Sequence, residues 1–142
     1  MLVDAILQSK GTQVHTLPET GTLADAVALL NTNNIGAVVI TSTKGAIAGI
    51  LSERDIVRRL GSDPGHALAL PIAQCMTRGV LTSQRNTPIA EVMERMTRYR
   101  IRHMPVAENG ALIGIVSIGD VVKHMLEEAE REAADLREYI AS

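Results

Sequence analysis

Apolar positions along the chain recur with two different periods, and each change of period marks a predicted element. Residues 23–30 and 89–96 carry apolar side chains at spacings of three and four, which predicts two amphipathic helices. A short extended segment precedes each helix, at 14–16 and at 80–82. Two short apolar runs joined by a Gly-containing turn follow each helix and predict two strand pairs: 37–41 with 46–51, and 103–106 with 111–116.

The same order of elements therefore occurs twice, and the sequence itself repeats. Residues 45–58 and 110–123 are identical at seven of fourteen positions without a gap. A further helix is predicted to begin at Ser52 in the first copy and at Ser117 in the second. Each copy is a β-α-β-β-α unit of about 50 residues, which is too small to bury both faces of its sheet alone. We therefore expect an α+β fold of two pseudo-symmetric repeats packed through their sheets.

The repeats divide the chain into five expected segments: a leading helix at 1–11, a first repeat at 12–62, a connector at 63–77, a second repeat at 78–126 and a C-terminal helical extension at 127–142. Apolar residues in and just before the extension alternate steps of four and three, at Val122, Leu126, Ala129, Ala133, Leu136 and Ile140. This spacing is typical of a short heptad seam. It predicts packing either against the chain's own body or against the helix of a partner.

Composition excludes several classes of protein. With 46% apolar and 21% charged residues, the chain can bury a core and is not disordered throughout. A net charge of −2 provides no overall positive field for nucleic acid or anionic lipid. No apolar stretch approaches the roughly 20 residues of a membrane span, the start lacks the basic segment of a secretory signal, and Cys75 is the only cysteine. We therefore expect a cytoplasmic protein with no membrane partner.

The most informative residues lie where the last strand of each repeat ends. The segments 49–55 and 114–120 share a Gly, two apolar residues, a Ser and, three positions later, an Asp. Two interpretations of this motif stay open. In the first, the Ser hydroxyl and the Asp carboxylate only cap the helix that begins there. In the second, the helix N-terminus and the Ser hydroxyl contact a phosphate while the Asp accepts both hydroxyls of a ribose, which would place a nucleoside phosphate site in each repeat.

Together with the Ile-Arg-His-Met-Pro-Val run at 101–106, these motifs make the chain resemble a tandem pair of CBS (cystathionine β-synthase) domains, or Bateman module, over residues 12–125. It is similar in particular to the small stand-alone bacterial members. In this family two pseudo-symmetric clefts form between the repeats and often bind adenosine compounds. The resemblance implies a regulatory, non-catalytic module for AMP, ADP or ATP, with NAD(H) and S-adenosylmethionine as further candidates. It also suggests a homodimer that acts on a protein target not identified by the sequence.

The resemblance further assigns roles to individual residues. Asp55 and Asp120 would hold ribose hydroxyls, and Ser52 and Ser117 would lie beside the ribose or a phosphate. Residues at the start of each central strand would line the adenine pocket with backbone groups and aliphatic surface: Gly36, Ala37 and Val38 in the first repeat, and His103, Met104 and Pro105 in the second.

Thr16 and Thr82, at the predicted ends of the leading strands, are weaker ligand candidates. The two copies also differ around the motif. Arg54 supplies a cation between Ser and Asp only in the first copy, whereas Arg102 and His103 adjoin the central strand only in the second. Because charge-assisted contacts to phosphate are stronger than neutral ones, we predict two sites that differ in affinity or in the number of phosphates that they accept.

The sequence leaves two alternative functions open. Residues 78–103 hold six Arg and two Glu, which keeps RNA binding as an alternative, although without interleaved aromatic residues we favour a solvated helix face and phosphate contacts. A ligand-free assembly module, in which the Ser-x-x-Asp motifs serve only as caps, is the other alternative. The four histidines show no metal-ligand spacing, and no nucleophile has a base beside it, so we expect no metal, no catalytic cofactor and no enzyme activity.

Overall fold

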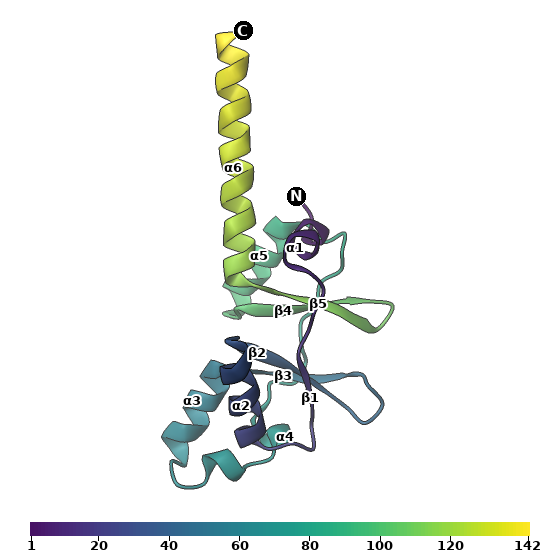
Figure 1. The fold of residues 1–142 in the computed structure, drawn as a ribbon, viewed down its shortest axis with the longest axis vertical. Coiled ribbons are helices and arrows are strands. Elements are labelled where there is room, and N and C mark those ends of the chain that lie inside the picture. Colours follow the sequence, from purple (N-terminus) through teal and green to yellow (C-terminus); the bar gives the residue numbers. More distant parts are fainter. The chain divides into compact units, whose positions relative to one another are not determined.

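The computed structural model describes residues 1–142 and has a mixed α+β architecture in which the helix-strand-strand-helix order of the first repeat recurs in the second (Figure 1). The predicted fold class is confirmed. The chain separates into two compact units, one of residues 14–81 with 110–112 and one of residues 1–13, 82–109 and 113–142. The N-terminal segment is thus grouped with the second repeat and not with the first, which follows it in the sequence.

The unit of the first repeat contains a three-stranded sheet. Its elements are β1 (Thr16–Pro18), α2 (Leu23–Asn33), β2 (Ala37–Thr41), β3 (Ile47–Ser52), α3 (Glu53–Ser62), the 3-10 helix η1 (Ala67–Ala69) and α4 (Ile72–Cys75). The central strand β2 is parallel to β1 and antiparallel to β3. Its first four side chains are buried, which explains why this segment is an unbroken apolar run. Leu23, Leu51 and Ile72 complete the core from α2, β3 and α4.

The unit of the second repeat contains a two-stranded sheet and three helices. Its elements are α1 (Val3–Lys10), α5 (Ile89–Tyr99), β4 (His103–Glu108), β5 (Ala111–Ser117) and α6 (Ile118–Ala141). The short helix α1 buries Val3, Ile6 and Leu7 and ends before Gly11, whose positive φ of 95° suits a glycine. The first helix of the chain therefore contributes its apolar face to the core of the second repeat.

Both predicted leading strands differ from the structure. β1 begins at Thr16, where the prediction ended it, because it pairs with the last three residues of β2. In the second repeat residues 80–82 form no strand, and only an isolated bridge joins Ser83 to β4. Pro105 accounts for this difference. Val39, which lies 66 positions earlier, donates its N–H to the leading segment at 3.4 Å, whereas proline has no N–H to donate.

Three helices begin with the same reciprocal cap. The hydroxyls of Thr22, Ser52 and Ser117 each accept from the N–H three residues later, and the Asp at that later position accepts from the N–H of the capping residue. The predicted helix starts at Ser52 and Ser117 are therefore confirmed. α5 instead follows Pro88 and has no side-chain cap.

Gly49 and Gly114 lie where two segments of the same unit approach closely. A Cβ on Gly49 would lie 2.7 Å from Met76 Sδ and 2.8 Å from the carbonyl oxygen of Thr77, which backbone hydrogen bonds hold against β3. A Cβ on Gly114 would lie 2.6 Å from Cδ2 of Leu7, at the end of a flexible side chain. Packing inside each unit therefore accounts for both glycines.

Gly49→Ala is expected to destabilise the fold by about 1–3 kcal/mol, because the added methyl group meets a backbone oxygen that cannot move aside. Gly114→Ala should cost less, since Leu7 can change its rotamer. Gly61→Ala in α3, where nothing lies within 4 Å, is the matched control and should be neutral or slightly stabilising. Urea unfolding ranks the three variants, and equal midpoints for the Gly49 and Gly61 variants would contradict this packing.

The last helix, α6, extends well beyond the rest of its unit (Figure 1). Only Val121 and His124, near its start, are buried. The predicted seam is exposed, with exposed fractions of 59% for Leu126, 60% for Leu136 and 73% for Ile140. Packing of this seam against the chain's own body, one of the two predicted arrangements, is therefore wrong. Neither α6 nor any other helix combines the length and the hydropathy needed to cross a membrane.

Candidate functional site

The Ser-x-x-Asp motifs form the same reciprocal cap in both repeats. Oδ2 of Asp55 accepts from the N–H of Ser52 at 2.9 Å, and Oδ2 of Asp120 accepts from the N–H of Ser117 at 2.9 Å. In return, the Ser hydroxyl oxygens accept from the N–H groups of Asp55 at 3.4 Å and of Asp120 at 3.2 Å. Of the two interpretations left open by the sequence, capping is thus realised in both repeats.

A third cap in the chain helps to separate capping from ligand binding. Thr22 and Asp25, at the start of α2, exchange the same two hydrogen bonds at 3.4 and 2.9 Å. The other two caps differ in position, because a strand runs directly into the helix: β3 into α3, and β5 into α6. Capping also engages only Oδ2 of Asp55, whose Oδ1 receives a single long contact of 3.5 Å from the Thr77 hydroxyl. This second oxygen retains capacity to accept hydrogen bonds.

The residue before each central strand lies at the same helix start. The N–H of Glu53 donates to the carbonyl oxygen of Gly36 at 3.0 Å, and the N–H of Ile118 donates to that of Arg102 at 2.8 Å. The motif and the start of the central strand are therefore brought together within each unit. These bonds and the cap engage the N–H groups of the capping residue and of the first and third helical positions. The helix start is consequently better suited to a sugar hydroxyl than to a phosphate.

One ion pair makes the two motifs unequal. Lys10, at the end of α1, donates from Nζ to Asp120 Oδ2 at 2.8 Å and to the carbonyl oxygen of Ile115 at 3.0 Å. The position 66 residues after Lys10 is Met76, and Asp55 forms no ion pair. The carboxylate of the second repeat is therefore engaged by a cation that the first repeat lacks.

The ion pair also changes the acidity of Asp120. Burial by itself would raise the pKa of this carboxyl group, but hydrogen bonds from Lys10 and Ser117 and the charge of Lys10 outweigh that effect. The pKa of Asp120 is consequently lowered from the ordinary value of 3.8. The folded state thus favours the ionised carboxylate.

Comparison with known proteins identifies the repeat. A family model of the CBS domain matches the chain twice, at residues 9–62 and 72–127. The chain belongs to the CBS domain family. It is 35% identical over 123 residues to the mitochondrial CBS domain-containing protein CBSX3 of Arabidopsis thaliana, an alignment that covers 84% of this chain but 60% of that protein's length. A CBS-domain protein structure from Agrobacterium tumefaciens has 40% sequence identity and a TM-score of 0.83, with 86% of this chain and 91% of that one covered.

Two further similar CBS structures contain adenosine compounds. The CBS domain protein from Pyrobaculum aerophilum complexed with AMP is 29% identical, with a TM-score of 0.75 over 84% of this chain and 89% of that one. The CBS domain pair of the protein MJ0100, in complex with 5′-methylthioadenosine and S-adenosylmethionine, is 26% identical, with a TM-score of 0.80 over 90% and 98% of the two chains. The resemblance to a tandem CBS pair is therefore confirmed.

The other predicted site residues of the two CBS repeats differ in burial. Arg54, Arg102 and Thr16 are exposed, Gly36, His103 and Thr82 are partly buried, and Ala37, Val38, Met104 and Pro105 are buried. Val38 and Met104 are fully buried, so their side chains belong to the core and only their backbone groups are candidates for a ligand. The carbonyl oxygen of Thr82 accepts from Arg95 at 3.1 Å.

Lys10 and Thr77, which contact the two Asp carboxylates, were not predicted from the sequence. Upstream of the strand pairs, equivalent positions of the two repeats lie 66 residues apart. This correspondence extends to residues before position 14, where Ile6 aligns with Ile72 and Gln8 with Gln74. Following it to Lys10 would have aligned this residue with Met76 and revealed a charge present in only one copy. The signal is weak, because few positions of this stretch are identical.

Apart from these motifs, the structure has few candidate groups for metal binding or catalysis. No group of three or more His, Cys, Asp or Glu side chains could hold a metal ion. Cys75 is buried in the core of the first repeat. Burial raises the pKa of its thiol more than the neighbouring Arg59 lowers it, so the reactive thiolate is disfavoured.

Lys10→Met, which copies the residue at the equivalent position of the first repeat, should remove the ion pair and raise the pKa of Asp120. A lowered carboxyl pKa stabilises the fold above the unfolded value, and this stabilisation is lost as the pH falls through the folded pKa. Wild-type protein should therefore lose stability more steeply than the variant between about pH 5 and pH 2. Thermal unfolding across this range is the measurement, with Lys44→Met as the exposed control. Parallel curves for wild type and Lys10→Met would contradict the assignment.

Proposed function

We propose that this chain is a non-catalytic regulatory module whose CBS repeats bind adenine nucleotides, with AMP or ATP ahead of NAD(H) and S-adenosylmethionine. The proposal rests mainly on the different hydrogen bonding of the two oxygens of the Asp55 carboxylate. Oδ2 caps α3, while Oδ1, in the first turn of the helix that directly follows β3, can accept further hydrogen bonds. Such an acceptor fits the hydroxyls of a ribose.

The relatives support the adenosine part of the proposal. AMP, in the Pyrobaculum protein, and 5′-methylthioadenosine with S-adenosylmethionine, in MJ0100, share the adenosine moiety and differ in the group on its 5′ carbon. A motif that contacts the ribose while most of its helix N–H groups are already bonded would tolerate such variation. By the same reasoning, the motif recognises the sugar, and nearby cations contact the phosphate.

The two repeats should differ in affinity for the nucleotide. A ribose that contacts Asp120 has to compete with Lys10, whereas Asp55 has no cation to displace. Binding at Asp120 would also release the end of α1 from β5 and from the start of α6. Because a ligand shifts a conformational equilibrium only through a contact that differs between its states, we infer that this ion pair couples binding to the packing of α1.

Heating the protein with AMP, ATP, NADH or S-adenosylmethionine tests the proposal. A ligand at 100 times its dissociation constant stabilises the folded state by about 2.7 kcal/mol, which raises the melting temperature of a domain of this size by roughly 5–10 °C. Calorimetry with AMP should then resolve two unequal sites. Unchanged melting with all four compounds would favour the ligand-free assembly module.

Asp55→Asn separates ligand binding from capping. The amide oxygen can still accept from the N–H of Ser52, but an NH₂ group replaces the second acceptor. Loss of a hydrogen bond to a charged group predicts AMP binding at that site weakened roughly 10- to 100-fold with little change in stability. Asp25→Asn alters the matching cap of α2 and is the control, which should keep AMP affinity unchanged. An equal loss of affinity in both variants would point to folding and not to ribose contact.

The ligand-free assembly module is retained as a second candidate, because both carboxylates do serve as caps. It accommodates the repeated motif without any ligand and differs from the main proposal in the melting experiment above. The homodimer, the cytoplasmic location and the regulated protein target stay predictions.

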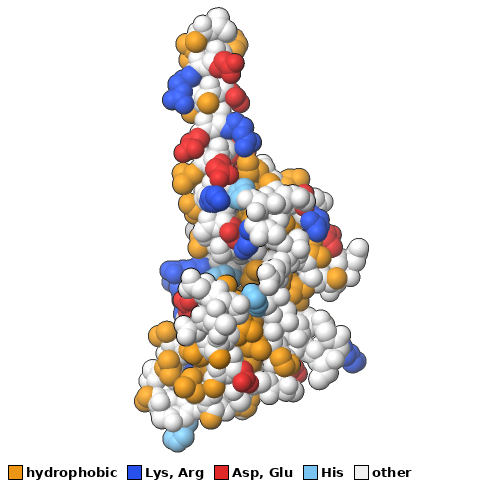
Figure 2. All heavy atoms as spheres, viewed as in Figure 1, with side chains coloured by type: hydrophobic (Ala, Val, Ile, Leu, Met, Phe, Trp, Pro, Cys, Tyr) orange, Lys and Arg blue, Asp and Glu red, His pale blue; other side chains and the backbone are white.

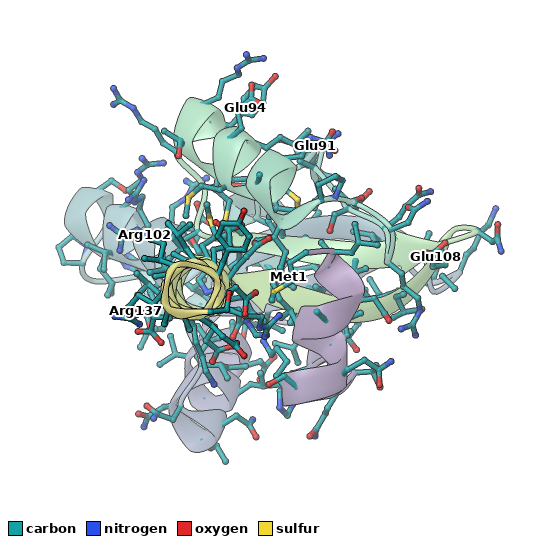
Figure 3. The ribbon with its side chains drawn as sticks, turned by 90° about the horizontal axis from the view of Figure 1, so that it is seen from above. Met1, Glu91, Glu94, Arg102, Glu108 and Arg137 are labelled. Carbon is teal, nitrogen blue, oxygen red and sulfur yellow. The ribbon has the colours of Figure 1, made fainter.

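RNA binding through residues 78–103 is weakened by ion pairs within the chain. Three of the six Arg in this stretch pair with acids: Arg85 with Asp4 at 2.7 Å, Arg95 with Glu91 at 2.8 Å, and Arg98 with Glu94 at 3.1 Å. Figure 3 shows the two glutamates extending from α5. These pairs engage three of the six Arg side chains that suggested RNA.

A further inference from the structure

The projecting part of α6 has an apolar face that its own chain leaves uncovered. α6 is 24 residues long, and beyond His124 none of its side chains is buried. In Figure 1 no other element of its unit lies beside the C-terminal half of the helix. Most of the stability of helices in proteins comes from packing of an amphipathic face, and this part of α6 has no such packing within its own unit. Figure 2 shows apolar side chains interspersed with acidic and basic ones along this projecting part.

The exposed apolar residues follow a heptad pattern, which we call the tail seam: Val122, Leu126, Ala129, Ala133, Leu136 and Ile140. Leu126, Ala133 and Ile140 occupy a positions, and the other three occupy d positions. Large side chains lie toward both ends of the seam and two alanines lie at its centre. Two identical helices in register would therefore place large residues opposite large ones and the small alanines opposite each other.

The charges beside the tail seam select the orientation of the partner helix. Glu132 occupies a g position, and Arg137 occupies the e position of the next heptad. In a parallel pair, Glu132 of one chain faces Arg137 of the partner subunit, and the pair occurs twice by symmetry. Residues five apart do not face each other along one helix, and neither residue has an ion-pair partner within the chain.

An antiparallel arrangement brings like charges together. The register that sets Leu126 opposite Leu136 also sets Lys123 beside Arg137, Glu130 beside its own copy and Glu132 beside its own copy. Each of these contacts is repulsive. Charge complementarity therefore favours the parallel pair.

We propose that the tail seam of α6 forms a parallel, in-register, two-stranded coiled coil with α6 of a second copy of this chain. The proposal is independent of nucleotide binding. It goes beyond the homodimer expected of the family because it assigns an interface, an orientation and an interhelical ion pair to a helix that extends outside the CBS repeats.

Disulfide trapping of the full chain tests the orientation. In a Cys75→Ala background without nucleotide, Leu136→Cys should oxidise to a covalent dimer at least ten times faster than Arg131→Cys, which lies on the opposite helix face. Leu136 is 60% exposed in the single chain, so the substitution should leave the fold intact, and thermal unfolding checks this. Equal rates would overturn the proposal. Preferential linkage of Leu136→Cys to Leu126→Cys in a mixture would establish the antiparallel pair and overturn it as well.

A charge exchange tests the ion pair in the chain without added cysteines. Glu132→Arg and Arg137→Glu should each weaken dimerisation roughly three- to tenfold in sedimentation equilibrium, and the double exchange should restore it. Arg131→Glu, on the far face, is the control and should have no such effect. If the losses in the double exchange were additive, Glu132 and Arg137 would not pair across the dimer. If dimerisation were unchanged in all four variants, the dimer would form through another surface. Either result would overturn the proposal.

Discussion

The fold and the candidate site depend on one shared group, the carboxylate that follows each strand-to-helix junction. One of its oxygens closes the first turn of the helix, and this fixes the direction in which α3 and α6 leave β3 and β5. The cap holds the partly buried side chain of Asp55 through Oδ2, so its remaining oxygen is positioned before any ligand arrives. Preorganisation of this kind lowers the entropic cost of binding. Capping and binding are thus compatible uses of the same residue.

The two CBS repeats of the chain are not equivalent. The unit of each repeat includes a short helix from outside the repeat core, α4 in the first unit and α1 in the second. Met76, directly after α4, and Leu7, within α1, each approach a strand glycine. Only α1 ends in a lysine that reaches the Asp carboxylate. A single charge difference between these two helices therefore gives one repeat an open acceptor and the other an internal ion pair.

Much of the fold could be predicted from the sequence, because apolar periodicity and helix caps are local signals. The helix starts at Ser52 and Ser117 and both strand pairs followed from such signals. The missing strand at 80–82 did not, since it depends on which N–H groups Pro105 removes from the opposite strand. Lys10 was missed for a related reason. Lys10 and Asp120 lie 110 positions apart, and nothing in the sequence around either residue indicates that they are in contact.

Carboxyl carbon NMR of the aspartates during a titration with AMP reports whether the second oxygen of Asp55 contacts the ligand. The Asp55 resonance is expected to move first, the Asp120 resonance to move only at higher AMP concentration, and the resonance of Asp25, which makes the same cap, to stay unchanged. Saturable binding of AMP that leaves the resonances of Asp55 and Asp120 unmoved would exclude ribose contact by these carboxylates.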